Sequence, residues 1–433
     1  MNIIHGDCLE ELKKLEDNSV DAVVCDPPYG LSNTKPQQVA DVLKAWVTGD
    51  TASVPAKRGG FMGKDWDSFV PPPAVWEECM RVLKPGGHMA VFAGARTQDL
   101  MGLSIRLAGF EIRDTLGWIY GSGMPKSHNI SKAIDKAAGA EREVVGAGKS
   151  GKTYGMGGLR GVETSTGSFD ITAPATSEAQ RWDGWGTALK PAIEPIILAR
   201  KPLDGTVANN VLAHGVGGLN IDACRVGMSD ADREAAKVPQ PVQHNDARAV
   251  YQMGTGEGRN GATFEPAPAG RFPANVLLDE HAAKEMDKQS GVSVSRANTS
   301  SDNRGAEGSH IFASASLGRR DPSNSHNDSG GASRFFPVFK YQAKAPKKER
   351  PVIEREDGSK IQHPTVKPLT LLEWLVELIT PPGGVVLDPF AGSGTTLQAA
   401  LNKGFTPIGI EQDADYIKLI EKRLEATCTT HKN

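Results

Sequence analysis

The stretch from residue 385 to residue 424 limits the fold of this chain more than any other part of the sequence. The apolar run VVLD leads into the glycine-rich turn PFAGSG, and a helix, a second strand and a second helix follow. We expect strands at Val385 to Leu387 and Pro407 to Ile410, with helices at Thr395 to Asn402 and Asp413 to Leu424. This order is a βαβα unit of the Rossmann type, which requires a parallel sheet.

The first 120 residues and the segment around residue 197 show the same alternation of strands and helices. Helical spacing also precedes the glycine-rich turn, at Val366 to Thr380. Alternating elements predict an α/β fold with a doubly wound, mixed sheet that helices cover on both faces. We therefore expect the two ends of the chain to be halves of one sheet. The further expected strands are Ser19 to Cys25, His88 to Phe92, Glu111 to Tyr120 and Glu194 to Arg200, and the further helices are Ala74 to Leu83 and Ala95 to Ala108.

The middle of the chain differs in composition from both ends. Residues 121 to 183 are rich in Gly, Ser and Thr, and residues 298 to 334 are rich in Ser, Asn and Gly with few apolar side chains. Structureless loops of such length are uncommon inside a compact domain. We interpret these stretches as long loops that become ordered on a partner.

Charge and cysteine content exclude several classes of protein. The 433 residues include 49 Lys and Arg against 52 Asp and Glu, which excludes a protein that grips nucleic acid through overall positive charge. Any anionic partner must therefore be met by a local basic patch. The sequence contains no stretch of about 18 apolar residues and no signal peptide, so we expect a cytoplasmic protein without membrane segments. The five cysteines are scattered singly, and the histidines lack ligand spacing, so we expect reduced thiols and no metal.

The glycine-rich turn after Asp388 predicts a ligand site. A phosphate-binding loop needs a Lys after its last glycine, where Thr395 stands, and a dinucleotide site needs a third glycine that is missing. A plain structural turn remains an alternative. Glu411 ends the next strand, where an acid can accept hydrogen bonds from both ribose hydroxyls. A nucleoside without phosphates fits best, and S-adenosylmethionine matches: its ammonium suits Asp388, and its carboxylate suits the amides and hydroxyls of residues 393 to 396.

The run Asp26-Pro27-Pro28-Tyr29 follows an expected strand directly, at the edge where ligands of open α/β sheets bind. Two prolines remove two backbone donors, so the loop offers acceptors, the Asp26 carboxylate and the Pro27 carbonyl, to an amine. Such acceptors would localise the lone pair of an exocyclic base amine for attack on a sulfonium methyl group, with Tyr29 stacked on the base. A base reaches this loop only after flipping out of the duplex. A turn that merely closes a strand is the alternative.

Together these residues resemble the DNA amino-methyltransferases, in the β-group order where DPPY precedes the target-recognition region and the glycine-rich turn comes last. Further matches are HGDC at residues 5 to 8, LKPGGHMAVF at 83 to 92 and HPTVKP at 363 to 368. Residues 124 to 136 and 185 to 202 look like solitary or prophage-encoded members. The resemblance implies that Asp7 and Cys8 lie at the cofactor, with Asp7 on the adenine amine. It also implies that Phe390 lies against the adenine ring, that Lys367 holds the methionine part, and that the protein forms homodimers.

We therefore expect a methyltransferase fold with an inserted target-recognition region, which methylates N6 of adenine in double-stranded DNA near the nucleoid. N4 of cytosine, RNA as the substrate, and an inactive DNA-binding regulator remain alternatives. The expected parts are residues 1–202, with the glycine-rich insert at about 121–190, the recognition region at 203–345 and the cofactor-binding half at 346–433. The candidate cofactor residues are Asp7, Cys8, Lys367, Asp388, Pro389, Phe390, Gly392, Ser393, Gly394, Thr395, Thr396 and Glu411.

Two sets of candidate residues face the DNA. Either Trp118 or Tyr120, which alternation places on the same face of a strand, completes the pocket for the target base, although a buried core role for Trp118 is an equal alternative. Lys126, Ser127 and Arg334 are candidate DNA contacts among the basic and polar residues of the middle region. For any single one of them, a solvated surface position is the alternative.

Overall fold

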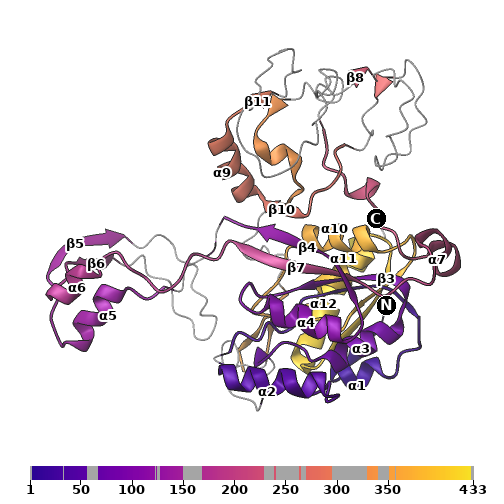
Figure 1. The fold of residues 1–433 in the computed structure, drawn as a ribbon, viewed down its shortest axis with the longest axis horizontal. Helices are drawn as coiled ribbons and strands as arrows, with labels where there is room; N and C mark the ends of the chain where they lie inside the picture. The colour runs from indigo at the N-terminus through magenta and orange to yellow at the C-terminus, as the bar shows by residue number, and fades with distance from the viewer. Residues whose placement is uncertain are drawn as a thin grey trace, which may run out of the picture. The chain divides into compact units, whose positions relative to one another are not determined.

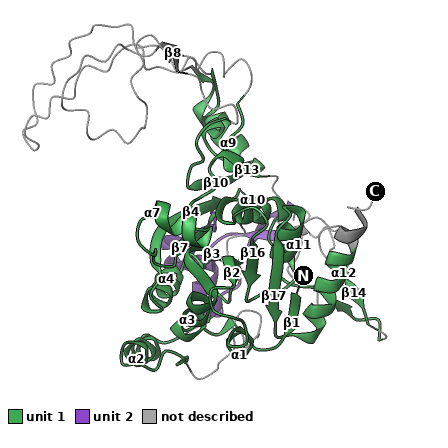
Figure 2. Cartoon of the chain, turned by 90° about the vertical axis from the view of Figure 1, so that its right-hand side faces the viewer, with its two compact units in different colours: residues 1–121, 193–433 green, residues 122–192 purple. Residues whose placement is uncertain are grey.

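A computed structural model describes residues 2–32, 34–55, 67–121, 123, 127–149, 168–228, 238–239, 263–264, 270–294, 329–339, 351–355 and 357–430. The chain forms two compact units, residues 1–121 with 193–433, and residues 122–192 (Figure 2). The expected boundaries at residues 202 and 345 do not appear in this division and stay a prediction.

The larger unit is built on a mixed sheet of nine described strands (Figure 1). Only β7 runs antiparallel to its neighbours, and all other adjacent pairs are parallel. In spatial order the strands are β1 (Asn2–His5), β17 (Thr406–Glu411), β16 (Val385–Asp388), β2 (Val20–Cys25), β3 (Leu83–Phe92), β7 (Ile193–Arg200), β4 (Glu111–Ile119), β10 (Val276–Asp279) and β13 (Val338–Phe339).

The two ends of the chain meet in the middle of this sheet. Strand β16 pairs with β2, with Val386 opposite Ala22 and Leu387 opposite Val23. The expectation that both ends contribute to one sheet is therefore confirmed. The whole of β2 is buried, as its continuous apolar run predicts for a central parallel strand.

Helices cover both faces of the sheet, as the alternating pattern predicts (Figure 1). Alternation along the strands divides the core, because Met89 and Val91 belong to one apolar cluster whereas Ala90 and Phe92 belong to the other. The first cluster contains residues of α1 (Cys8–Leu12), α2 (Pro36–Val47), α3 (Pro73–Val82) and α4 (Gln98–Leu107). The second contains residues of α10 (Leu369–Ile379) and α11 (Thr395–Asn402), and α12 (Ala414–Thr430) packs against α11.

Two expected helices begin later than the spacing indicates. Helix α10 begins at Leu369 rather than Val366 because Pro368 takes the N-cap position in an extended conformation. Helix α4 begins at Gln98 because the chain first turns between Gly94 and Thr97. Strand β3 is longer than expected, since it already pairs with β2 at Leu83.

The expectation of long loops through residues 121 to 183 is wrong for the described part of that stretch. The smaller unit contains α5 (Ile130–Ala137), α6 (Ser177–Arg181) and a hairpin of β5 (Val144–Lys149) and β6 (Ser168–Thr172). A buried carboxylate holds it together, because Asp135 accepts hydrogen bonds from Arg142 and from the backbone of Ala175 and Thr176. Pairing of these polar groups replaces the apolar core that the composition lacks.

The expected recognition region is described in pieces. Strands β10 and β13 extend the main sheet beyond β4, and α7 (Val207–His214), α9 (Glu280–Ser290) and the short helix η6 (Ala332–Phe335) lie nearby in the chain. Most of the Ser and Asn-rich stretch from residue 298 to residue 334 lies outside the described residues. Its interpretation as a loop therefore remains a prediction.

Three negative findings apply to the described residues alone. No helix among them has the length and apolar character needed to cross a membrane. Within the described ranges, no group of three or more His, Cys, Asp or Glu side chains is arranged to hold a metal ion. The four cysteines whose side chains are described carry free thiols, and three of these, Cys25, Cys79 and Cys224, are buried.

Candidate active site

Two sequence motifs emerge from neighbouring strands at one edge of the sheet. Strand β2 ends at Cys25, so Asp26 opens the loop at its carboxyl end, and β16 ends at Asp388, where the glycine-rich turn begins. Because β2 and β16 are adjacent and parallel, both motifs lie at the same edge. The structure thus brings together residues that are more than 350 positions apart in the chain.

The loop from Asp26 to Tyr29 is fixed by hydrogen bonds at both ends. The Tyr29 hydroxyl donates to Asp26 Oδ1 at 2.7 Å, and the Tyr29 amide donates to Asp67 Oδ1 at 2.7 Å. The Thr97 hydroxyl donates to the Tyr29 carbonyl at 2.6 Å. Burial, with the charges of Asp26 and Glu194 nearby, raises the pKa of Tyr29 far above its usual range, so the hydroxyl keeps its proton. No pattern in the sequence pointed to Asp67 or Thr97.

The side chain of Lys367 contacts the loop from Asp26 to Tyr29. Its ammonium donates to the Tyr29 hydroxyl at 2.9 Å and to Glu194 Oε2 at 3.1 Å, and lies 3.2 Å from Asp26 Oδ1. Burial lowers the pKa of Lys367, but the two carboxylates outweigh it and raise the pKa above the usual value. The lysine is therefore a permanent cation beside Asp26. Glu194 lies at the beginning of β7 and was not a candidate in the sequence.

Backbone conformation and close packing demand glycine in the turn. Gly392 and Gly394 have φ values of 53° and 76°, which side chains rarely adopt. A Cβ atom on Gly392 would lie 3.0 Å from Nε2 of His363, and one on Gly394 would lie 3.0 Å from Cγ2 of Ile420. Gly394 is the N-cap of α11, so the turn leads the chain into the amide end of that helix.

The hydroxyls of the turn flank the beginning of α11. Ser393, Thr395 and Thr396 are buried, and the Ser393 and Thr395 hydroxyls lie 3.2 Å apart. Arg423 of α12 fixes the backbone of the turn, because its Nε donates to the Ser393 carbonyl at 2.7 Å. These residues give the turn a rigid set of amide and hydroxyl donors.

Asp388 is a buried acid without a cationic partner among the described residues. Its side chain is only 2% exposed, and its Oδ1 accepts the Phe390 amide at 3.0 Å. Burial raises the pKa of Asp388 to about 7, and the charges of Asp26 and Glu411 add to this against hydrogen bonds from Thr396 and Phe390. A ligand ammonium would supply the missing charge, so the residues present fit the methionine end of S-adenosylmethionine.

Glu411 is held beside the turn by two backbone amides. Gly392 N donates to its Oε2 and Asp413 N to its Oε1, each at 2.8 Å. Burial raises the pKa of Glu411 against these hydrogen bonds. Each carboxylate oxygen keeps a further lone pair, so the side chain remains able to accept from two hydroxyls.

Asp7, Cys8 and Phe390 surround the same edge. The loop that carries Asp7 lies next to β17, because the Gly6 amide donates to the Glu411 carbonyl at 3.0 Å. Asp7 itself caps α1 through the Leu9 amide. Burial, with the charge of Asp7, raises the pKa of the Cys8 thiol to about 12, so Cys8 acts as an apolar contact. Pro389 is buried, and the Phe390 ring packs 6.1 Å from that of Trp76.

The structure separates the two aromatic candidates for the base pocket. Trp118 is 4% exposed and packs edge-on against Phe339, with ring centroids 5.8 Å apart. Tyr120 is half-buried, and its pKa is raised by burial and by the charge of Glu194, while the Lys367 ammonium opposes the rise. Tyr120 and Tyr29 pack against the same apolar cluster, whereas Trp118 is a buried member of that cluster.

The three candidate DNA contacts have different outcomes. Lys126 lies outside the described residues. The Ser127 hydroxyl accepts the amides of Thr187 and Ala188 within the smaller unit. Arg334 Nη1 donates to the Gly330 carbonyl at 2.7 Å, and its guanidinium lies 4.2 Å from the centroid of the Phe335 ring. No described contact tests a role in DNA binding for any of them.

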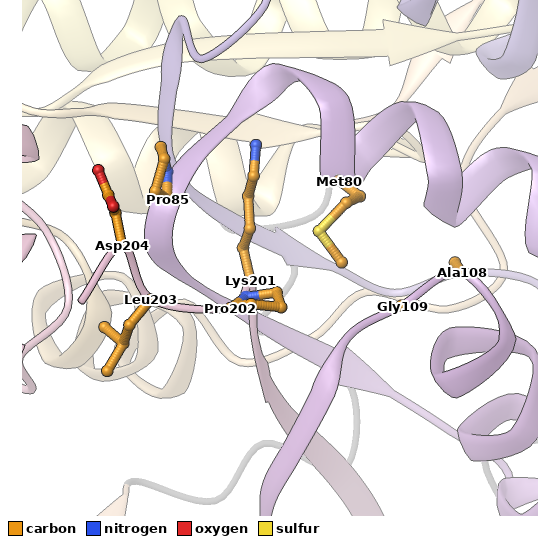
Figure 3. A pocket seen from close by; sticks show the side chains of 8 residues that line it. All are labelled: Met80, Pro85, Ala108, Gly109, Lys201, Pro202, Leu203 and Asp204. Atoms are coloured by element: carbon orange, nitrogen blue, oxygen red, sulfur yellow. The ribbon is translucent and has the colours of Figure 1, made fainter. Parts of the chain in front are cut away.

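A cavity of about 450 Å³ lies away from this edge (Figure 3). It is lined in part by Met80, Pro85 and Lys201, around the first residues of β3, and therefore lies at the opposite end of the strands from Asp26. Lys201 donates to Asn18 Oδ1 and to the Leu83 carbonyl, which ties strands together. We assign no functional role to this cavity.

Comparison with known proteins identifies the family. The sequence pattern of the N6/N4 DNA methylases matches residues 20–422, which is most of the chain. The chain belongs to this family. S-adenosylmethionine is the methyl donor of DNA methylases of this family.

Individual relatives match over shorter lengths. The type II methyltransferase M.HindIII of Haemophilus influenzae is 26% identical over half of this chain and 64% of its own length. The DNA adenine methyltransferase YhdJ of Escherichia coli is 48% identical over 14% of this chain and 21% of its own length. The chain thus matches less than two thirds of either relative. The M1.HpyAVI complex with SAM, a solved structure, is 15% identical, covers 98% of both chains and has a TM-score of 0.38.

Proposed function

We propose that this protein is a site-specific DNA methyltransferase that transfers a methyl group from S-adenosylmethionine to N6 of adenine in double-stranded DNA. One observation carries the proposal. A single edge of the sheet holds both a loop of hydrogen-bond acceptors that begins at Asp26 and a buried acid, Asp388, which has no cationic partner among the described residues. A cationic methyl donor and an amine acceptor are the pair of reactants that this arrangement suits.

The donor site draws on two groups of residues. Asp388 would hold the ammonium, and the amides and hydroxyls of residues 393 to 396 would hold the carboxylate. Glu411 would accept the ribose hydroxyls, and Asp7, Cys8, Pro389 and Phe390 would surround the adenine. S-adenosylmethionine, when bound, supplies an electrophilic methyl group on a sulfonium. The contacts of Lys367 favour a place at the acceptor loop rather than at the methionine part.

The acceptor loop would prepare the amine for attack. The Asp26 carboxylate and the Pro27 carbonyl each accept one hydrogen of the amine, which localises the nitrogen lone pair. The nitrogen would take up the methyl group while the electron pair of the broken bond stays on the sulfur, and Asp26 or solvent water would accept the proton that the nitrogen releases. Orienting two reactants in this way is worth roughly 7 to 11 kcal/mol of the barrier.

Adenine is our choice of base for two reasons. DPPY-type members resembling this chain act mainly on adenine, and the relative YhdJ is named as a DNA adenine methyltransferase. The base would flip out of the duplex at a cost of a few kcal/mol and stack against Tyr29, with Tyr120 on the other side. Methylation of N4 of cytosine is the second candidate, since the family includes both activities.

Two assays test this proposal. Methylation-sensitive sequencing of DNA from cells with and without the protein should reveal N6-methyladenine at one sequence context. Transfer of a labelled methyl group in vitro should be lost in Asp26→Ala by a factor of roughly 100 or more, while calorimetry shows unchanged binding of S-adenosylmethionine. Label on cytosine would contradict adenine as the target base, and label on RNA would contradict DNA as the substrate. If the wild-type protein transferred no methyl group at all, the proposed activity would be refuted, and an inactive DNA-binding regulator would be the remaining candidate.

The same proposal includes the domain boundaries, the oligomeric state and the cellular location of the protein. Residues 203–345 would read the DNA sequence as the target-recognition region, between a catalytic part at 1–202 and a cofactor part at 346–433. The protein would act as a homodimer of the β-group order, beside the nucleoid in the cytoplasm. A monomeric mass in light scattering at working concentration would contradict the dimer.

A further inference from the structure

One lysine at the candidate active site is shared between two carboxylates. The Lys367 ammonium lies 3.2 Å from Asp26 Oδ1 and 3.1 Å from Glu194 Oε2, and donates to the Tyr29 hydroxyl at 2.9 Å. An ammonium has three N–H donors, and these three acceptors match them in number. The lysine side chain is only 12% exposed, so solvent screens these contacts little.

Glu194 is brought to this place by the one antiparallel strand of the sheet. It lies opposite Trp118 at the beginning of β7, where β4 ends. Its side chain is 25% exposed and reaches a lysine 173 residues further along the chain. Its electrostatic influence extends to the aromatic side chains of Tyr29 and Tyr120. No other part of the proposed reaction uses this carboxylate.

Sharing the lysine changes what Asp26 can offer to a substrate. A lysine paired with Asp26 alone would move toward it and compete with the target amine for its lone pairs. With Glu194 present, the ammonium is held between the two acids, and Asp26, Lys367 and Glu194 together carry a net charge of about −1. Positive charge develops on the amine nitrogen during methyl transfer, so a net negative cluster beside it stabilises the transition state.

We propose that Glu194 is a positioning residue for methyl transfer: by sharing the Lys367 ammonium with Asp26, it keeps the lysine from pairing with Asp26 alone and so leaves the Asp26 carboxylate able to accept the target amine. The inference rests on the proposed function. Glu194 does not itself touch the substrate. The effect of Glu194 on methyl transfer is exerted through Lys367. A residue that only stabilised the sheet would not depend on Lys367 in this way.

The first experiment compares Glu194→Gln with the wild-type protein on a duplex that contains the recognition sequence found by sequencing. We expect kcat to fall by roughly 10- to 100-fold, because Lys367 would then pair with Asp26 alone and compete with the target amine for the lone pairs of that carboxylate. Binding of S-adenosylmethionine, measured by calorimetry without DNA, should stay unchanged, since the described hydrogen bond of the Glu194 carboxylate goes to Lys367 and not to the glycine-rich turn. Glu194→Asp keeps the charge and should recover part of kcat. Wild-type kcat in Glu194→Gln would overturn the inference.

A double-mutant cycle with Lys367→Met then separates positioning from structure. If Glu194 acts through the lysine, adding Glu194→Gln to Lys367→Met should leave kcat within about twofold of the Lys367→Met value. A second, full loss in the double variant would overturn the inference, because Glu194 would then act by another route.

Glu111→Gln is the matched control, because Glu111 also forms an ion pair across β4 and β7, with Arg200 at 2.7 Å, at the far end of these strands. It should keep wild-type kcat, and an equal loss there would overturn the inference as well. Absence of transfer by the wild-type protein would instead refute the proposed function, and this inference with it. Equal kcat values in an active wild type and in Glu194→Gln would refute the inference alone.

Discussion

Replacing Asp388 by Asn should make the ligand-free protein more stable at high pH while weakening its binding of S-adenosylmethionine. The pKa of Asp388 is about 7 in the folded protein, mainly because burial disfavours the charged form. In the unfolded chain an aspartate titrates at about 3.9. Between these values the folded state keeps a proton that the unfolded state has released. The free energy of unfolding therefore falls as pH rises through this window.

The size of this effect follows from the pKa shift. Each pH unit inside the window costs about 1.36 kcal/mol, so the Asp388 contribution falls by about 3 kcal/mol between about pH 4 and pH 7 and levels off above pH 7. An asparagine cannot ionise, and its carbonyl can still accept the Phe390 amide. The stability of Asp388→Asn relative to wild type should therefore rise by about 3 kcal/mol over the same range.

Urea denaturation at several pH values measures this difference directly, with Glu111→Gln as a control that should follow the wild-type profile. Saturating S-adenosylmethionine should reduce the difference, since its ammonium would compensate the buried charge. Calorimetry near pH 7 should show that Asp388→Asn weakens this binding by roughly 10- to 100-fold. Parallel stability profiles for wild type and variant would refute the view that Asp388 is a buried acid awaiting a cation.

Three further substitutions test neighbouring assignments. Trp118→Ala should lower the free energy of unfolding by about 3 to 5 kcal/mol in thermal or urea unfolding, because the ring is buried against Phe339. Tyr120→Ala should leave stability nearly unchanged but lower kcat for methyl transfer, and unchanged kcat would remove it from the base pocket. Glu411→Gln should weaken S-adenosylmethionine roughly tenfold in calorimetry, because an amide cannot serve both backbone donors and ribose. Wild-type affinity in this variant would exclude the ribose role.

Local patterns predicted the elements that form the proposed site. The apolar runs before Asp26 and Asp388 are strands, and the glycines at 392 and 394 have the backbone conformations that their place in a tight turn requires. Each of these features depends on a few consecutive residues, so it can be seen without knowledge of the fold. The expected start of α10 was wrong, because the conformation imposed by the proline before this helix outweighed the helical spacing of the apolar residues.

Contacts between residues far apart in the chain could not be predicted from local sequence patterns. Asp135 and Arg142 build a compact unit from a stretch whose composition suggested loops, because burial of an ion pair leaves no periodic signal. The same holds for Asp67 and Thr97, which fix the loop at Tyr29 from distant segments. The choice between Trp118 and Tyr120 also needed the structure, since alternation gives both the same face.

The sequence by itself determined that this chain has parallel strands ending in an acidic glycine-rich turn and in an acceptor loop. These properties come from apolar runs, prolines and glycines that act over neighbouring residues. Only the tertiary structure decided that Lys367 lies between Asp26 and Glu194, and that Asp388 is buried with no cation beside it in the part of the chain that the structure describes. The physical reason is that charge, burial and pKa depend on which strands lie side by side, and the order of strands in a sheet differs from their order in the chain.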